Sequence, residues 1–299
     1  MAAFVEALLD RFHERTPIRA GSLIVTVFGD AVVPRGGVLS LTSLHEIMRA
    51  FRISDTLVRT ALSRLVSDGW FERWKVGRNS YYQLTSQGRG AFAQATQRIY
   101  ADPPQDWRGG FDLVLLENAQ DRQTARAKLS EAGYGALGPD LFIAAAAATG
   151  GEGAFLRLAA TPADLPTARR LVERAWPLEE IESRYTRFTN TYSGTLKALQ
   201  SGAPFTDLDA LLVRILLIHD YRRAVLKDPL LPPPLLPEPW AGTAARALCG
   251  TIYKTLLPAA ERWIDAHAQY DEGALPEADG GFRQRFAAFP AIADAGLLG

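Results

Sequence analysis

Hydroxyl and guanidinium side chains share one side of a helix that the sequence predicts from a cap at Ser54 to about residue 67. They recur at helical spacing at Thr56, Arg59, Thr60, Ser63 and Arg64, with Arg59 on the flank. Hydroxyl groups can approach base edges or phosphates, and a guanidinium can bridge O6 and N7 of guanine. These residue types at this spacing predict a surface that contacts nucleic acid.

The elements around this helix are predicted from apolar periodicity and breaker residues. Val58, Leu62, Leu65 and Val66 form the opposite, apolar face of the helix. Ser43, with Glu46 three residues later, predicts a capping box that opens a short preceding helix over residues 44–51. A further helical pattern over residues 22–33 is broken by a proline and two glycines.

Two β-rich runs follow the helix, at residues 70–75 and 80–84, and residues 76–79 form a predicted hairpin tip. The order helix, helix, helix, hairpin is that of a winged helix-turn-helix, whose recognition helix enters the major groove. Lys75, Arg78 and Asn79 at the tip could hold backbone phosphate or enter the minor groove.

One residue opposes this interpretation. Asp55 opens the recognition helix, where its carboxylate would repel phosphate. It could instead favour the helix dipole or accept from the amino group of cytosine. The alternative is a helix-turn-helix used only for protein packing.

Composition sets the wider limits. The chain has 299 residues, 47% of them apolar, and a formal net charge of zero, so it can bury a core in two or three domains. Residues 1–98 carry thirteen basic and eight acidic side chains, and this basic head is consistent with a polyanion as partner. Cys249 is the single cysteine, which excludes an internal disulfide.

We expect a cytoplasmic protein. The N-terminus carries charges every few residues and lacks the apolar core of a signal peptide. The longest apolar stretch, Leu208 to Ile218, is too short to cross a bilayer and contains Asp209 and Arg214.

Beyond a polar, proline-containing linker at residues 101–106, the order strand, helix, strand, strand, helix predicts a ferredoxin-like α+β unit. A polar connecting helix is predicted from Leu178 to about Leu199, and a second helix from Phe205 to Asp228. Residues 229–239 hold six prolines and predict an extended segment. A long final helix from Trp240 to about His267 precedes a tail rich in Gly and Ala.

The chain resembles PaaX-type repressors of phenylacetic acid degradation, and the resemblance covers nearly its whole length. The N-terminal signature runs through Leu23-Ile24-Val25-Thr26, Gly29-Asp30, Val58-Arg59-Thr60-Ala61-Leu62-Ser63-Arg64-Leu65, Gly69-Trp70 and Gly77-Arg78-Asn79-Ser80-Tyr81-Tyr82-Gln83-Leu84-Thr85. The C-terminal signature runs through His219-Asp220-Tyr221-Arg222-Arg223, Asp228-Pro229-Leu230-Leu231-Pro232, Leu236-Pro237, Trp240 and Gly242.

The resemblance implies an α+β multidomain, homodimeric transcriptional repressor of an aromatic-acid catabolic operon. It implies a DNA-binding winged helix at residues 1–100, a central domain similar to the Cas2 fold at 107–178 and a helical effector and dimerisation domain at 179–299. The usual inducer in that family, phenylacetyl-coenzyme A, releases the DNA. By position, Thr56, Arg59, Thr60, Ser63 and Arg64 would belong to the recognition helix, and Arg78 and Asn79 to the wing.

An acyl-coenzyme A inducer needs cations for its phosphates and an apolar, aromatic-lined cleft for its acyl group. The expected effector residues cluster before and after the proline-rich segment: His219, Tyr221, Arg222, Arg223, Lys227 and Trp240. The alternative is that they are interface or core residues. Second-rank candidates lie on the connecting helix, at Tyr185, Arg187 and Tyr192.

We expect neither an enzyme nor a bound cofactor or metal. The four histidines are scattered, and the chain has no GxSxG, P-loop or GxGxxG motif. The strongest catalytic candidate is Asp112, at the position where Cas2-type nucleases keep a metal-binding aspartate, and one carboxylate makes a poor magnesium site. A metal-dependent nuclease and an interaction scaffold without DNA affinity remain the alternatives.

Overall fold

The structure is a computed structural model that describes residues 1–14, 20–117, 122–145 and 155–292. Its contacts divide the chain into two compact units. Unit 1 comprises Met1–Ala101, Arg187–Arg223 and Thr243–Gly299. Unit 2 comprises Asp102–Thr186 and Ala224–Gly242. Unit 1 therefore combines segments from both ends of the sequence.

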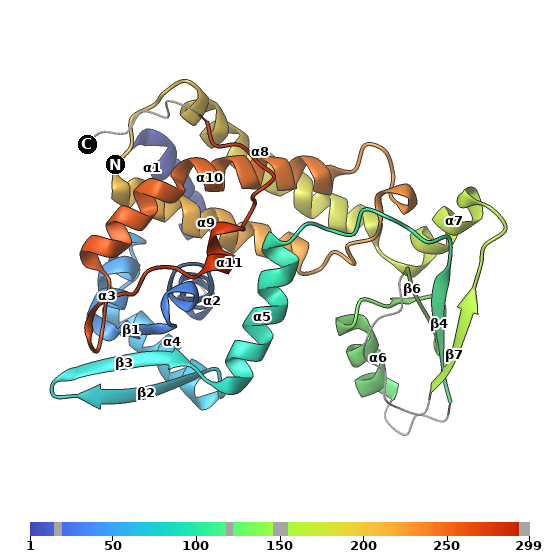
Figure 1. Ribbon diagram of the computed structural model, residues 1–299, viewed down its shortest axis with the longest axis horizontal. Coiled ribbons are helices and arrows are strands. Elements are labelled where there is room, and N and C mark those ends of the chain that lie inside the picture. Colours follow the sequence, from blue (N-terminus) through green and yellow to red (C-terminus); the bar gives the residue numbers. More distant parts are fainter. Residues whose placement is uncertain (15–19, 118–121, 146–154, 293–299) are drawn as a thin grey trace. The chain divides into compact units, whose positions relative to one another are not determined.

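The N-terminal part of unit 1 contains short helices and one antiparallel sheet (Figure 1). Its helical elements are α1 (Ala3–His13), α2 (Ala20–Val27), the π-helical turn η1 (Phe28–Val32), the 3-10 turn η2 (Val33–Arg35), α3 (Leu41–Ala50), α4 (Asp55–Ser67) and α5 (Ser86–Tyr100). Its strands are β1 (Val38–Ser40), β2 (Phe71–Val76) and β3 (Asn79–Leu84), in the order β1-β3-β2.

Local signals explain where these helices begin. Ser54 accepts from the backbone N–H of Leu57 and caps α4, as the sequence predicted. The predicted cap of α3 was wrong by one turn. Ser40, not Ser43, is the N-cap, because its hydroxyl accepts from the Ser43 N–H. Ser43 is turned inward instead, where its hydroxyl accepts from the backbone N–H of Gln269.

The sheet and the helices share one apolar core. In the β2–β3 register Phe71 lies opposite Leu84, and both side chains are buried. The Phe71 ring meets Phe28 of η1 edge-on, with centroids 4.6 Å apart. Val58 and Leu62 bury the predicted apolar face of α4. The base of the hairpin is thereby held against the helices, and its tip extends beyond them.

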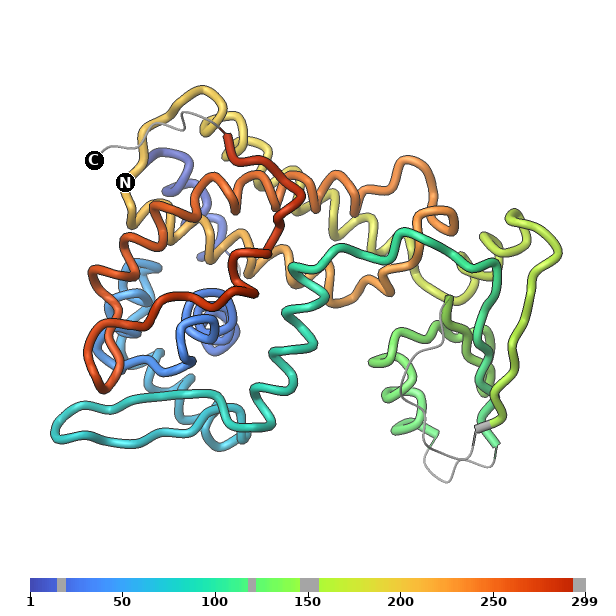
Figure 2. The backbone as a smooth tube through the Cα atoms, viewed as in Figure 1, coloured from blue at the N-terminus to red at the C-terminus, as the bar shows by residue number. Residues whose placement is uncertain are grey.

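The C-terminal part of unit 1 lies beside the N-terminal part, as the path of the chain shows (Figure 2). Its elements are α8 (Leu178–Gln200), α9 (Asp207–Val225), α10 (Ala241–His267), β8 (Gln269–Tyr270), β9 (Gly273–Ala274) and α11 (Gly280–Arg283). Three of these helices also extend into unit 2: unit 1 contains α8 from Arg187 onward, α9 as far as Arg223 and α10 from Thr243 onward. The Asp279 N–H donates to the Pro34 carbonyl at 2.9 Å, so the tail is part of the packed structure.

Unit 2 contains an antiparallel sheet in the order β5-β6-β4-β7. Its elements are β4 (Phe111–Leu116), α6 (Arg122–Glu131), β5 (Gly135–Ala136), β6 (Leu141–Ala144), β7 (Phe155–Ala160), α7 (Leu165–Ala175) and the 3-10 turn η3 (Pro233–Leu235). Alternate residues of β4 enter two different cores: Phe111 packs with α7 and the proline-rich segment, and Val114 packs with α6.

One prediction about this region needs correction. The last helix of the predicted strand, helix, strand, strand, helix order is expected from the run Thr161-Pro162-Ala163-Asp164, with Thr161 as its cap. It begins later, because Asp164 is the N-cap and accepts from the Thr167 N–H. Helix α8 runs from unit 2 into unit 1, as the predicted connecting helix should, and its tyrosines are packed inside the protein. Tyr185 and Tyr192 are buried, and their hydroxyls donate to carboxylates of Asp228 and Asp220.

Candidate nucleic-acid interface

Helix α4 presents the polar side chains that the sequence singled out. The apolar residues Val58 and Leu62 face the core, and the opposite face is exposed. That exposed face carries Thr56, Arg59, Thr60, Ser63 and Arg64. The spacing of these five residues places them on adjacent turns, so the helix brings them together on one surface.

The carboxylate of Asp55, whose charge would repel phosphate, is paired with an arginine. Arg49 of α3 donates to both oxygens of Asp55, at 2.8 and 2.5 Å. The hydrogen bond from Arg49 lowers the pKa of Asp55 below its usual value. His45 Nδ1 lies 3.5 Å from the same carboxylate, and burial lowers the pKa of His45. The negative charge at the start of α4 is therefore offset by Arg49.

The turn between α3 and α4 is tied to α1. Arg52 has a φ of 59°, in the left-handed region that favours glycine. Its guanidinium pairs with Glu6, and with Asp10 at 2.7 Å. An arginine at this position gains contacts with α1 that a glycine could not make.

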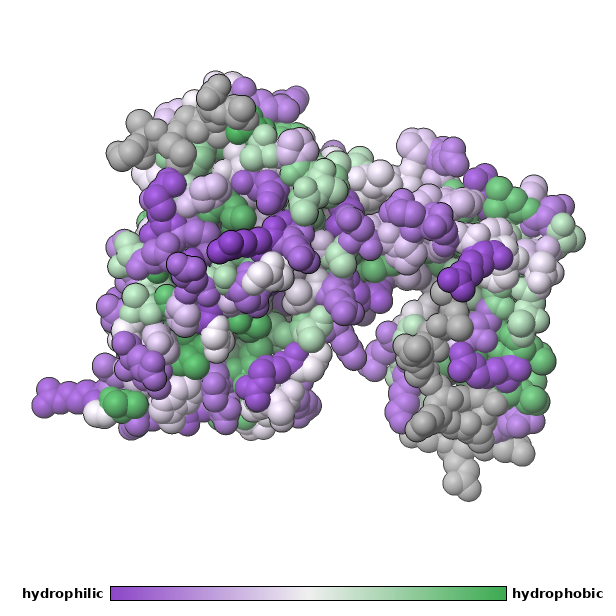
Figure 3. Space-filling view, viewed as in Figure 1, coloured by the Kyte–Doolittle hydropathy of each residue, from purple (hydrophilic) through white to green (hydrophobic). Residues whose placement is uncertain are grey.

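The hairpin ends in an exposed basic tip. Lys75, Arg78 and Asn79 are all exposed, and Gly77 supplies the positive φ of the turn. Figure 3 shows hydrophilic side chains at this end of the hairpin. Behind the tip Trp74 stacks on Tyr81, with centroids 5.9 Å apart, which stiffens the hairpin where it leaves the core.

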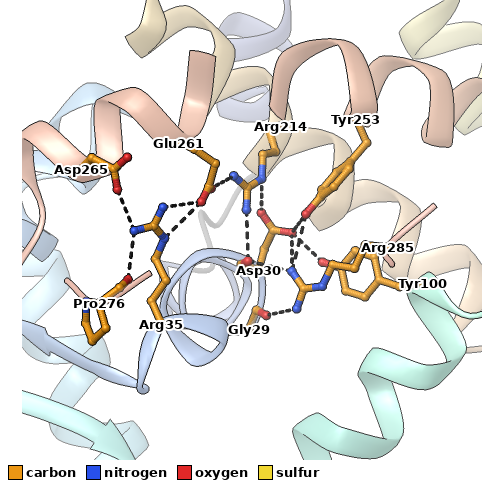
Figure 4. Close-up of polar contacts among 10 residues, drawn as sticks. All are labelled: Gly29, Asp30, Arg35, Tyr100, Arg214, Tyr253, Glu261, Asp265, Pro276 and Arg285. Atoms are coloured by element: carbon orange, nitrogen blue, oxygen red, sulfur yellow. Dashed lines mark hydrogen bonds and ion pairs between the residues drawn. The ribbon is translucent and has the colours of Figure 1, made fainter. Parts of the chain in front are cut away.

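A buried polar network joins η1 to α9, α10 and the C-terminal segment, and the sequence did not predict it (Figure 4). Asp30 of η1 pairs with Arg214 of α9 at 2.7 Å and with Arg285 at 3.3 Å. Its carboxylate also accepts from the hydroxyls of Tyr100 and Tyr253, at 2.6 and 3.1 Å. The available signals were one aspartate in an apolar helical run and one arginine in the most apolar stretch of the chain.

The network continues along α10. Glu261 accepts from Arg214 at 2.5 Å and from Arg35 of η2 at 2.5 Å. Arg35 also pairs with Asp265 at 2.7 Å. Burial is the largest single effect on the pKa of Arg214 and lowers it. The carboxylates of Asp30 and Glu261 and the hydroxyl of Tyr253 together outweigh burial, so this pKa is raised.

Comparisons with known proteins agree with the expected family. A family model described as "PaaX-like protein" matches residues 19–88, and one described as "PaaX-like protein C-terminal domain" matches residues 176–266. The transcriptional repressor PaaX of Escherichia coli (strain K12) is 34% identical over 287 residues, which covers 90% of each chain. This chain belongs to the PaaX family. The predicted resemblance is confirmed.

A solved structure adds a likeness in fold. The uncharacterized protein Rv0674 from Mycobacterium tuberculosis matches with a TM-score of 0.50 and 18% identity, over 74% of this chain and 89% of that one. The match to PaaX, a regulator and not an enzyme, agrees with the expectation that this chain is no enzyme. None of the described helices is long and apolar enough to span a bilayer.

The expected effector residues of this PaaX-family chain differ in burial and in their contacts. His219 and Tyr221 are buried in unit 1, and Arg222 donates to Ser22. Arg223 is exposed in unit 1, and Lys227 is exposed in unit 2. Trp240, in unit 2, meets Tyr185 edge-on at a centroid distance of 6.2 Å.

The nuclease candidate Asp112 is held by neighbours. Its carboxylate accepts from Tyr134, and from Arg157 at 2.7 Å. Burial and the bond to Asp112 raise the pKa of Tyr134 to about 12. In the described ranges no group of three or more His, Cys, Asp or Glu side chains could hold a metal ion. The contacts of Asp112 are those of a structural polar cluster on the sheet.

Proposed function

We propose that this chain is a DNA-binding transcriptional repressor whose segment from α3 to β3 acts as a winged helix-turn-helix. In this proposal α4 is the recognition helix in the major groove. The exposed tip of the β2–β3 hairpin is the wing, and its cations meet backbone phosphate or the minor groove. The observation that carries the proposal is the polar, exposed face of α4 beside an exposed basic hairpin tip.

The relative named a transcriptional repressor supports the same function, since its similarity extends over 90% of both chains. The Arg49–Asp55 pair supports it physically, because an unpaired carboxylate at the start of α4 would repel phosphate. We further propose that the protein acts in the cytoplasm as a homodimer. Two copies of α4 would then read half-sites about 34 Å apart.

We also propose that the central domain, residues 107–178, has a ferredoxin-like, Cas2-like fold, that the helical C-terminal domain, residues 179–299, serves effector binding and dimerisation, and that an acyl-coenzyme A thioester is the effector. The operon would be one of aromatic-acid catabolism, and phenylacetyl-coenzyme A is the leading inducer. Arg223 and Lys227 are each a candidate cation for its phosphates, because each side chain is exposed. His219, Tyr221 and Arg222 make contacts inside unit 1, and Trp240 remains the aromatic candidate.

The deciding experiment is fluorescence anisotropy on DNA from immediately upstream of the protein's own gene cluster, at fixed physiological salt. Scrambled DNA is the control, and each titration is repeated with phenylacetyl-coenzyme A. Tight binding that the thioester abolishes supports both the repressor and its effector. Specific binding that ignores the thioester supports the DNA-binding function and contradicts the effector. Equal affinity for scrambled DNA contradicts the function and favours a scaffold.

Substitutions in α4 test the assigned surface. Arg59→Ala and Arg64→Ala should each weaken operator binding by about 1–3 kcal/mol if the side chain bonds to a base edge. The matched control is Arg174→Ala, which removes an exposed arginine from α7 in unit 2. Operator affinity of both α4 variants equal to that of the control would show that α4 is not the reading helix.

A further inference from the structure

A line of polar contacts joins α2 and η1 to α9 inside unit 1. We define this polar seam by three pairs of residues: Ser22 with Arg222, Thr26 with His219, and Asp30 with Arg214. The three residues on the N-terminal side are four positions apart and so share one face of the helical run. Their partners follow in the reverse order along α9.

The Thr26 end of the seam is a connected network. Arg222 donates to the hydroxyl of Ser22 at 2.7 Å and to its carbonyl at 3.1 Å. The Thr26 hydroxyl lies 3.0 Å from the same carbonyl and 3.0 Å from His219 Nδ1. When its single proton is donated to the Ser22 carbonyl, the hydroxyl must accept from Nδ1–H. Thr26 thereby fixes the orientation of the His219 ring.

The Asp30 end uses backbone as well as side chains. Arg214 donates to the Asp30 carbonyl at 3.1 Å, and Arg285 donates to it at 2.8 Å. Arg285 also reaches the Gly29 carbonyl at 3.2 Å. These carbonyls belong to the π-helical turn η1, where the regular helical hydrogen bonds are shifted. The guanidinium groups therefore bind the backbone of this turn as well as the carboxylate of Asp30.

The other side of α2 lies against the proposed recognition helix. Gly21 faces α4, since a Cβ atom there would lie in ordinary van der Waals contact, at 3.9 Å, with both Ala61 Cβ and Leu65 Cδ1. Phe28, at the start of η1, contacts Phe71 at the base of the hairpin. The run from α2 to η1 is therefore packed between α9 and the two elements proposed to meet DNA.

We propose that the polar seam positions the recognition helix by fixing the register of α2 on α9, with Thr26 as a positioning residue for DNA recognition. The inference rests on the proposed function. Apolar contacts alone tolerate sliding between helices, whereas buried hydrogen-bonding groups lose their partners when the register changes. A seam of three polar pairs, two of them buried and the Ser22–Arg222 pair half-buried, holds one register, and α4 follows α2 through their contact.

The test compares variants of the full-length protein that differ by single groups. Thr26→Val removes the buried hydroxyl and keeps the shape of the side chain, and Thr26→Ser keeps the hydroxyl. Thr191→Val in α8 is the matched control, because the Thr191 hydroxyl also donates to the carbonyl four residues earlier, on Arg187, and lies outside the seam. Affinities for operator and scrambled DNA are measured together with amide hydrogen exchange in α4.

Thr26→Val should remain folded and lose operator affinity by about 5- to 150-fold, the range typical of coupling between sites. Its affinity for scrambled DNA should change less than about twofold, since non-specific binding depends on exposed cations. Amide exchange in α4 should rise. Thr26→Ser should recover most of the operator affinity, and Thr191→Val should match the parent.

The inference is overturned if Thr26→Val binds the operator like the parent, if both DNA affinities fall together, or if serine fails to rescue. Should Thr26→Val not fold, Arg222→Met at the half-buried end of the seam takes its place, with the same expectations. Should the parent show no preference for the operator, the proposed function fails. In that case amide exchange in α4 is the only test of whether the seam positions this helix, and exchange in Thr26→Val equal to that of the parent would reject the inference.

Discussion

At the scale of single residues, Asp30 is a buried group on which several polar contacts converge. Its carboxylate is almost fully buried, at 1% exposure, and faces two arginines and two tyrosines. A buried charge without partners is costly, and removing one partner leaves the others uncompensated. Gly29 next to it is also constrained, because a Cβ atom there would lie 2.7 Å from the Phe92 ring.

The tyrosines of this network predict a stability limit at high pH. Burial raises the pKa of Tyr253 to about 12, whereas its unfolded-state pKa is near 10. The folded state keeps the phenol proton longer, so the stabilisation is complete below pH 10 and is lost as the pH rises from 10 to about 12. The loss from this group should approach about 2–3 kcal/mol of unfolding free energy.

Urea denaturation at pH 9, 10 and 11 would measure this loss. Tyr253→Phe should be less stable than the parent at pH 9, because it loses a hydrogen bond to Asp30, and its stability should fall less steeply above pH 10. Tyr270→Phe, at a tyrosine whose hydroxyl donates to nearby Glu272 in β8–β9, should change the slope less than Tyr253→Phe does, because the hydrogen bond to Glu272 raises the pKa of Tyr270 without burial in a core. Equal slopes for Tyr253→Phe and the parent would contradict the assignment.

At the scale of elements, the β2–β3 hairpin separates into a base and a tip. The base is set by the Phe71–Leu84 pair in the core, and the tip carries exposed cations. Charges at such a tip act on phosphate without reading sequence. The hairpin should therefore contribute to affinity, and α4 to specificity.

Salt dependence can separate these contributions. Arg78→Ala should reduce the slope of log K against log salt by about 1, and Lys75→Ala combined with it by about 2, because each phosphate contact releases one counterion. Val76→Ala is the control: it changes a 52% exposed apolar side chain at the same tip without changing charge. A slope for the double variant equal to that of Val76→Ala would remove the hairpin from the DNA contact.

At the scale of the molecule, the proposed DNA-reading segment is built into unit 1 together with the C-terminal helices. Arg214 and Tyr253 reach Asp30 from α9 and α10, and Arg246 donates to the Tyr100 carbonyl at 3.1 Å. Movement of α9 or α10 would therefore act on α2 without passing through a flexible linker. If the proposed effector binds beside these helices, a small helix shift would be enough to alter the proposed DNA contact.

A fragment comprising residues 1–101 tests this dependence. Without the C-terminal helices Asp30 loses both arginines, and apolar core residues such as Phe28 lose part of their cover. The fragment should melt without a cooperative transition or well below the intact chain, as measured by circular dichroism. Asp30→Asn should recover part of its stability by removing the unpaired charge. A fragment that melts cooperatively at the parental temperature would contradict this account.

The sequence alone determined the local elements and the exposed polar face of α4. Apolar spacing and breaker residues act over a few positions, so they specify helix α4, its Ser54 cap and the β2–β3 turn before any tertiary contact forms. The cap of α3 was misassigned because Ser40 and Ser43 offer equivalent local chemistry. Their difference arises from Gln269, more than two hundred residues away.

Only the tertiary structure decided the roles of Asp30, Arg214, Arg285 and the expected effector residues His219 and Arg222. Their partners are about 180 to 255 positions away in the chain, and no periodicity encodes which buried charge meets which. Local sequence determines the face of the helix on which a polar side chain lies. Long-range packing determines whether it meets solvent, a ligand or another buried group.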